Sequence, residues 1–169
     1  MTEPAAPDLA AAQRMWQEYA AARPAAVAAC PEHTVERFGD SAELADELLA
    51  LVLGGRKRAT AALVSEFAAN GEDLPRVGSL WIACDGGGAP RVVLRSTELR
   101  LGTFPTVDAA FARDEGEGDR SLESWRRGHR RYWERTCAAR GVTWSEHDEI
   151  VLERFRVVWP SEVADPDTF

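Results

Sequence analysis

The segment SLWIACDGGGAPRVVLRSTELRL, residues 79–101, decides the fold class. Two runs rich in β-branched and apolar residues, 79–84 and 91–101, flank a turn with the sequence DGGGAP. This pattern is typical of a β-hairpin. The glycines do not indicate a phosphate-binding loop, because they join two strands, open no helix and lack the Gly-Lys-Ser/Thr ending. A further apolar strand is expected at 150–159, so the sequence predicts a sheet in the second half of the chain.

The first half of the chain is mainly helical in pattern. Residues 9–23 carry apolar and aromatic side chains near one helical face, and residues 41–53 repeat leucine at helical spacing before Gly54 ends the helix. A short strand is expected at 34–38 and an alanine-rich helix at 61–69. Together with the hairpin, these segments predict an α+β domain with a barrel-like sheet and helices on its outside.

The second half contains two further predicted helices. Thr106 can cap a short helix that runs to Phe111, and residues 121–140 form a long helix closed by Gly141. One face of the long helix is aromatic and includes His129, and the other is basic. The basic face is either a solvated helix surface or a surface that follows a phosphate chain. Its residues are Arg126, Arg127, Arg130, Arg131 and Arg135.

Length and composition are those of a globular protein of 169 residues. We expect a helix packed on the domain over residues 1–30, one domain over 31–160 and a tail over 161–169. No apolar run approaches the ~20 residues that cross a bilayer, and the N-terminus lacks the features of a signal peptide. The chain is therefore expected to be cytoplasmic and to have no membrane partner.

The three cysteines do not form a metal or disulfide pattern. Cys30, Cys84 and Cys137 are far apart, odd in number and without a C-x-x-C pair or a histidine at zinc-ligand spacing. Free thiols are the expected state, and Cys84 ends an apolar strand as a core residue would. No metal or other cofactor is expected.

The charge distribution limits the kinds of partner. A net charge of −8 argues against a surface that binds long duplex nucleic acid electrostatically. The basic residues gather instead at 56–58 and 126–135. A nucleoside, a nucleotide or a short single-stranded RNA suits this distribution better. The oligomeric state is left open.

The sequence GRKRAT at 55–60 contains the first candidate site residues. Thr60 becomes a nucleophile only if a neighbouring base takes its proton. Lys57 is that base only as a neutral amine, a form favoured by burial and by the like charges of Arg56 and Arg58. The alternatives are that Thr60 caps the helix at 61–69 and that Lys57 is a solvated or phosphate-binding cation.

Two residues outside this turn are further candidates. Glu153 shares a strand face with apolar residues, and an inward carboxylate needs a partner such as Lys57 or an arginine, although a position at the rim is the alternative. His129 lies among aromatic residues as a core histidine would, but its charge change near neutrality leaves an acid–base role open. Trp81 and Trp144 could stack on a base, and Trp81 is more simply a core residue.

Four motifs in the expected order resemble the ASCH domain family, which is related in fold to the PUA RNA-binding domain. They are G-x-K-x-x-T at 55–60, EGEGDRSLESW at 115–125, H-x-x-Y-W at 129–133 and ERFRVVWP at 153–160. The resemblance covers about Val35 to Pro160 and is greatest to the longer bacterial members. It implies a PUA-like β-barrel flanked by helices. Some members hydrolyse N4-acetylcytidine, another is a ribonuclease, and others are presumed to bind RNA without chemistry.

The resemblance also implies a catalytic set. It pairs Lys57 and Thr60 with a glutamate of the acidic loop, for which Glu117 is the best positional match and Glu115 the second; a solvated loop is the alternative. Amide hydrolysis would use Thr60 as nucleophile, Lys57 as base and Glu117 as proton shuttle or orienting group. The expected substrate-binding residues are Arg56, Arg58, Glu115, His129, Tyr132 and Glu153.

Two other activities remain open at this point. RNA cleavage would use Lys57 and an arginine to stabilise phosphate charge, with Thr60 or Tyr132 in support. In a non-catalytic RNA-binding module, the three basic residues at 56–58 would contact phosphates.

Overall fold

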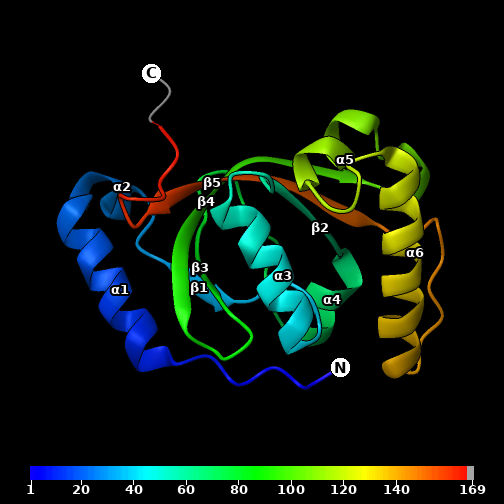
Figure 1. The fold of residues 1–169 in the computed structure, drawn as a ribbon, viewed down its shortest axis with the longest axis horizontal. Helices are drawn as coiled ribbons and strands as arrows, with labels where there is room; N and C mark the ends of the chain where they lie inside the picture. The colour runs from blue at the N-terminus through cyan, green and yellow to red at the C-terminus, as the bar shows by residue number, and fades with distance from the viewer. Residues whose placement is uncertain (167–169) are drawn as a thin grey trace. The chain divides into compact units, whose positions relative to one another are not determined.

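The computed structural model describes residues 1–166, so residues 167–169 of the expected tail lie outside the described part. The strands form a mixed five-stranded sheet in the order β1-β3-β4-β5-β2 (Figure 1). β1 is parallel to β3, whereas the β3–β4 and β2–β5 pairs are antiparallel. The predicted α+β fold class is confirmed. The strands are β1 (His33–Glu36), β2 (Ala59–Leu63), β3 (Leu80–Cys84), β4 (Pro90–Gly102) and β5 (Ile150–Trp159).

The chain divides into two compact units. The first contains residues 1–54, 76–97 and the described residues from 155 onward, and the second contains residues 55–75 and 98–154. β4 and β5 therefore each contribute residues to both units. All of the candidate site residues belong to the second unit.

The first unit holds its helices against β3 and β4 with apolar side chains. In Figure 1, α1 lies alongside these strands, and Trp16 and Tyr19 of α1 are buried in the same cluster as Ile82 of β3. Trp81 is buried in a separate cluster beneath α3, as its core assignment predicts. The helices of this unit are α1 (Leu9–Ala22), α2 (Pro24–Ala29) and α3 (Ala42–Leu53).

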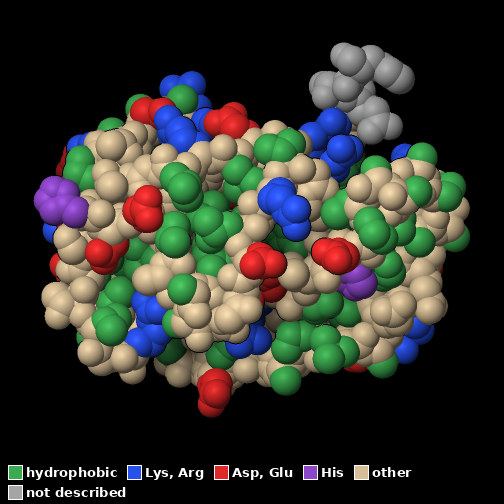
Figure 2. Space-filling view, turned by 180° about the vertical axis from the view of Figure 1, so that it is seen from behind, with side chains coloured by type: hydrophobic (Ala, Val, Ile, Leu, Met, Phe, Trp, Pro, Cys, Tyr) green, Lys and Arg blue, Asp and Glu red, His purple; other side chains and the backbone are tan. Residues whose placement is uncertain are grey.

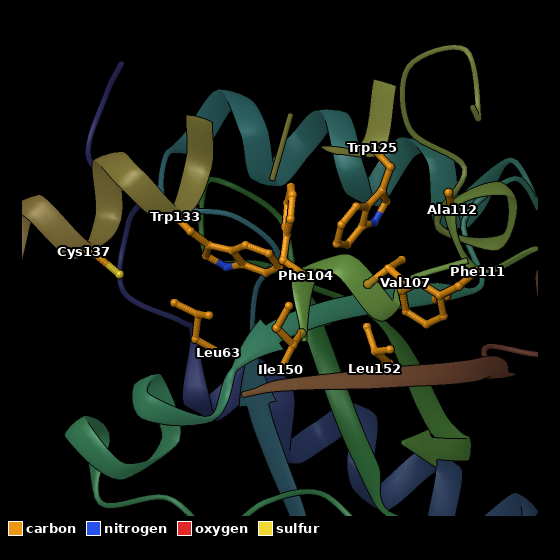
Figure 3. Packing of buried hydrophobic residues seen from close by; sticks show 11 residues of the cluster. Leu63, Phe104, Val107, Phe111, Ala112, Trp125, Trp133, Cys137, Ile150 and Leu152 are labelled. Carbon is orange, nitrogen blue, oxygen red and sulfur yellow. The ribbon is translucent and has the colours of Figure 1, made fainter. Parts of the chain in front are cut away.

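The second unit is built around the aromatic face of α6. Figure 3 shows Phe104 between Trp125 and Trp133, above strand residues that include Ile150. The Phe104 ring centroid lies 5.6 Å from that of Trp125 and 6.3 Å from that of Trp133, spacings typical of packed aromatic rings. Ser121 caps α6 by accepting a hydrogen bond from the Ser124 amide at 3.0 Å. The helices are α4 (Val64–Asn70), the 3₁₀ helix η1 (Phe104–Thr106), α5 (Ala109–Glu115) and α6 (Leu122–Ala139).

The helix expected at 61–69 is wrong in its first part. Residues 59–63 form β2, and the helix α4 begins only at Val64. β2 pairs along its whole length with β5, and Ala59 and Leu63 are fully buried, so sheet pairing overrides the helix propensity of alanine here. Thr60 is a strand residue and does not cap a helix.

The helix expected from Thr106 also begins later. The side chain of Asp108 accepts a hydrogen bond from the Phe111 amide at 2.8 Å, and this caps α5. The Thr106 hydroxyl instead bonds to the Thr103 carbonyl within η1 at 2.8 Å.

The state of the cysteines agrees with the prediction from the sequence. Cys30, Cys84 and Cys137 are free thiols, as predicted, and the last two are buried. Burial and the nearby charge of Asp85 raise the pKa of Cys84 to about 11, so this thiol stays protonated at neutral pH. Within residues 1–166, no helix has both the length and the apolarity needed to cross a membrane.

Candidate active site

Two segments of the second unit meet to form the framework of the site: residues 55–58, a loop before β2, and residues 114–118, which are the end of α5 and the loop that follows it. The Arg58 amide donates to the Asp114 carbonyl at 2.7 Å, and the Arg56 guanidinium donates to the Gly118 carbonyl. Gly116 has a φ of +74°, and a Cβ atom built there would lie 2.3 Å from the Arg56 carbonyl oxygen. Glycine is therefore required where the loops touch.

Lys57 lies at the junction of these loops and is 1 % exposed. Its Nζ is 2.7 Å from Oε1 of Glu117 and 3.7 Å from Oε1 of Glu115. Lys57 is also the only lysine in the sequence, so all the other basic residues of the chain are arginines. A buried ammonium needs paired carboxylates to be stable, and the acidic loop supplies two of them.

Glu115, the last residue of α5, is the buried centre of the cluster and is 1 % exposed. Its Oε2 accepts a hydrogen bond from Trp125 Nε1 and lies 3.1 Å from His129 Nε2. Burial alone raises the pKa of Glu115, but the charges of His129 and Lys57, with the hydrogen bonds from His129 and Trp125, outweigh burial and lower this pKa to about 2. Glu115 is therefore a carboxylate at any physiological pH.

His129 extends the cluster into the core from the inner face of α6. Its Nδ1 lies 3.1 Å from the Trp125 carbonyl oxygen, and its ring stacks on the Trp125 indole with centroids 4.0 Å apart. Burial lowers the pKa of His129, but the charge of Glu115 and the hydrogen bond to it have the larger combined effect and raise this pKa. His129 is thus a core residue, as one interpretation of the sequence has it, and it contacts the site as well.

Thr60 and Glu153 are direct cross-strand partners on β2 and β5. Opposed residues of an antiparallel pair project to the same side with Cβ atoms ~5 Å apart, so the hydroxyl and the carboxylate are neighbours. Glu153 is 7 % exposed, which agrees with the predicted inward position rather than with a position at the rim. Thr60 is half-buried and lies two residues beyond the Arg58 amide that anchors the loop.

The other predicted binding residues have mainly structural contacts. Arg58 Nη1 donates to the Lys57 carbonyl at 2.7 Å, and Arg56 is used in the loop contact described above. Tyr132 packs partly against the core of the second unit, and the Arg135 guanidinium carbon lies 5.4 Å from its ring centroid. Within the basic triplet, Arg56 is exposed, Lys57 is buried and Arg58 is half-buried, and each has a contact within the loops.

The cluster could be mistaken for a metal site, because ligand atoms of Glu115, Glu117 and His129 lie within 4.8 Å of one another. However, Lys57 Nζ already supplies the cation between the two carboxylates. Both ring nitrogens of His129 also face oxygen atoms, whereas a metal ligand must offer a lone pair. We therefore assign no metal ligand here.

The arginine face of α6 borders an open concavity of about 630 Å³ that is separate from the Lys57 cluster. Part of its charge is neutralised, since Arg127 pairs with Glu123 at 2.8 Å and Arg130 pairs with Glu146. Because of these ion pairs, the arginine face of α6 resembles a solvated helix surface more than a continuous basic track. On the side of the molecule that Figure 2 shows, Lys and Arg side chains also lie in separate groups with acidic and hydrophobic side chains between them.

Sequence reasoning missed two features of the cluster. The contact between Glu115 and His129 joins residues from two helices, and no local pattern announces it. The second feature was visible in the composition: Lys57 is the only lysine among the 20 basic residues of the sequence.

The fold agrees with comparisons to known proteins. The family model of the ASCH domain matches residues 34–159, and the chain belongs to this family. The crystal structure of an ASCH domain from Lactobacillus crispatus JV V101 is 29 % identical and superposes with a TM-score of 0.79, covering 87 % of this chain and 93 % of that one. A protein from Enterococcus faecalis V583 is 27 % identical with a TM-score of 0.76, covering 89 % of each chain. No curated protein matches the chain. The predicted family and its PUA-like fold are therefore confirmed.

Proposed function

We propose that this protein is a hydrolase that removes the acyl group from an N4-acylated cytosine, presented as a nucleoside, a nucleotide or a short single-stranded RNA. The observation that carries the proposal is the only lysine of the chain, buried between two carboxylates. Arginine cannot release a proton in a protein, whereas lysine can. A chain that uses arginine at every other basic position retains lysine here because the amine must exchange a proton.

The first half of the reaction forms an acyl-enzyme. Substrate binding excludes water, and Lys57 passes a proton to Glu117, whose Oε1 lies 2.7 Å away. The Thr60 oxygen then attacks the acyl carbon while its proton moves to the neutral Lys57 amine. The C–N4 bond breaks, and N4 of cytosine takes the proton from Glu117, which leaves an ester on Thr60 and free cytidine.

The second half restores the enzyme. Water attacks the ester carbon and gives one proton to Glu117, and the released Thr60 oxygen takes a proton from the Lys57 ammonium. The products are a carboxylic acid and the original hydroxyl. Lys57 and Glu117 then return to the ion pair. Glu153 faces Thr60 across the strands and orients its hydroxyl in this scheme.

The contacts of the basic triplet disfavour the alternative, a non-catalytic RNA-binding module. Lys57 is 1 % exposed and paired with Glu117, so a phosphate would have to displace it from that carboxylate, and Arg56 and Arg58 each already donate to a backbone carbonyl. The same argument applies to RNA cleavage with these residues as phosphate ligands. The net charge of −8 supports a small ligand over a long duplex, and the free cysteines support a cytoplasmic setting.

The deciding experiment compares wild type with Lys57→Arg and Thr60→Ala in the hydrolysis of N4-acetylcytidine, followed by chromatography. Lys57→Arg keeps the positive charge but cannot transfer a proton. If Lys57 acts as the base, this variant loses turnover. If Lys57 acts only as a cation that binds phosphate, the variant retains RNA binding. Thr60→Ala loses turnover if threonine is the nucleophile. Arg56→Lys serves as the matched control, with thermal melts for all variants. Wild type that binds short RNA but leaves N4-acylated cytosines intact would overturn the proposal.

A further inference from the structure

We propose that Glu115 and His129 are positioning residues for Lys57, and that the site is competent only while His129 is a cation. The inference rests on the proposed function of Lys57 as a proton-transferring base. It assigns a role to a buried pair that lies one contact away from the reacting groups.

The geometry around His129 requires both ring nitrogens to donate. Nδ1 faces the Trp125 carbonyl oxygen at 3.1 Å, and Nε2 faces Oε2 of Glu115 at 3.1 Å. A carbonyl oxygen and an ionised carboxylate only accept hydrogen bonds, and a neutral imidazole has a single N–H. Glu115 is ionised because Lys57 lies 3.7 Å away and Trp125 donates to the same carboxylate. His129 therefore carries both protons.

The four groups form a row of alternating charge that runs from the core to the surface. His129 is cationic, Glu115 anionic, Lys57 cationic and Glu117 anionic, and the side chain of Glu117 is 33 % exposed. The charged groups that act on His129 come from three elements: Glu115 from α5, Glu117 from the following loop and Lys57 from the loop before β2. On α6 itself, the rings of Trp125 and Trp133 flank the imidazole.

This order explains why Lys57 faces Glu117 more closely than Glu115. The carboxylate of Glu115 is already engaged by His129 and by the Trp125 indole, so Lys57 makes its short contact, 2.7 Å, with Glu117. If His129 lost its second proton, Glu115 would keep Lys57 as its main counter-charge. Lys57 would then be drawn away from Glu117, and the proton exchange that the reaction needs would stop.

The direction of the pH dependence follows. The competent form has His129 protonated, and contact with Glu115 raises the pKa of His129. The site is therefore fully active below the pKa of His129, and its activity is lost as the pH rises through this pKa. Removing the carboxylate lowers the pKa and moves the loss to lower pH.

The first test needs no substrate. The chain has three histidines and one lysine, so imidazole NMR signals are few and an amine reagent modifies Lys57 and the N-terminus alone. In wild type, we expect the His129 titration midpoint to lie above the ordinary value of ~6.5 and to fall by about one pH unit or more in Glu115→Gln. Reductive methylation of Lys57, followed by mass spectrometry, should become faster in Glu115→Gln, which removes a counter-charge, and slower in His129→Gln, which leaves Lys57 as the main counter-charge of Glu115. It should not change in Arg127→Gln, an exposed control on the same helix. Wild-type His129 that is neutral at pH 6 would overturn the inference even if a variant failed to fold.

The second test measures turnover against pH. We expect the fall of kcat/KM at high pH to shift downward in Glu115→Gln and to vanish in His129→Gln, with kcat reduced by about 10- to 100-fold and KM little changed. If wild type hydrolyses the substrate and both variants have the same kcat and pH profile as wild type, the positioning role of Glu115 and His129 is refuted and the hydrolase proposal stands. Absence of wild-type turnover, with the NMR and methylation results as expected, would refute the hydrolase but leave the pair.

Discussion

Replacing Glu115 with glutamine tests how much the buried cluster contributes to folding. The substitution keeps the size of the side chain and an acceptor for Trp125, but it removes the charge that faces His129 and Lys57. The pKa of Glu115 is lowered from 4.5 to about 2. At 1.36 kcal/mol per unit, this difference corresponds to about 3 kcal/mol of stability at neutral pH. Breaking a buried ion pair by removing one partner has a similar cost, about 3 to 5 kcal/mol.

The assay is urea unfolding of wild type and Glu115→Gln at pH 7 and at low pH. Because the folded-state pKa of Glu115 is depressed, its contribution is present above the unfolded value of 4.5 and is lost as the pH falls toward about 2. The two proteins should therefore differ by about 3 kcal/mol at pH 7 and converge in acid. Glu117→Gln, at a partly exposed position, is the comparison and should cost less than Glu115→Gln, because Glu115 still faces Lys57 in that variant. Equal stability of wild type and Glu115→Gln at pH 7 would refute the reasoning.

Further predictions concern the loop, the helix, the core and metals. Gly116→Ala should destabilise the protein by about 1 to 3 kcal/mol, because a Cβ atom would strain the backbone and meet the Arg56 carbonyl; a near-wild-type urea midpoint would contradict this. Gly128→Ala, on α6 with open space around it, should stabilise by about 1 kcal/mol in the same assay. Trp133→Ala should cost about 3 to 5 kcal/mol, since this fully buried ring contacts Phe104 and Trp125, and retention of the wild-type melting temperature would speak against that packing. EDTA should leave the melting temperature unchanged, because Lys57 Nζ supplies the cation that the two carboxylates face; a drop that added zinc reverses would contradict this.

The parts of the fold that the sequence predicts well are those set by local pattern. The hairpin of β3 and β4 has two strands rich in apolar and β-branched residues and the turn between them in one segment, and α6 has a complete aromatic stripe between Ser121 and Gly141. β2 was missed because its residues, ATAAL, have no strong strand propensity. Its conformation comes from pairing with β5, whose residues lie about ninety positions further along the chain.

In the candidate site, too, some residues could be predicted from local sequence and some contacts could not. Lys57 and Thr60 are candidates from a short motif and Glu117 from the family resemblance, and the family match supports the fold in which they lie. The contact of Glu115 with His129 depends on how α5 and α6 pack, and the requirement for glycine at position 116 depends on how two loops touch. Such contacts depend on tertiary packing, so one sequence does not contain them as a pattern.

Burial also distinguishes the two glutamates between which the motif alone could not decide. Glu115 is buried, engaged by three groups and held at a pKa of about 2, so it cannot take up a proton at neutral pH without a large cost. The side chain of Glu117 is 33 % exposed and its Oε1 lies 2.7 Å from Lys57 Nζ, so it can exchange protons with both the amine and water. A general acid or base must gain and lose a proton in each cycle. The physical argument therefore favours Glu117 as the proton shuttle and Glu115 as the fixed charge that holds Lys57 in place.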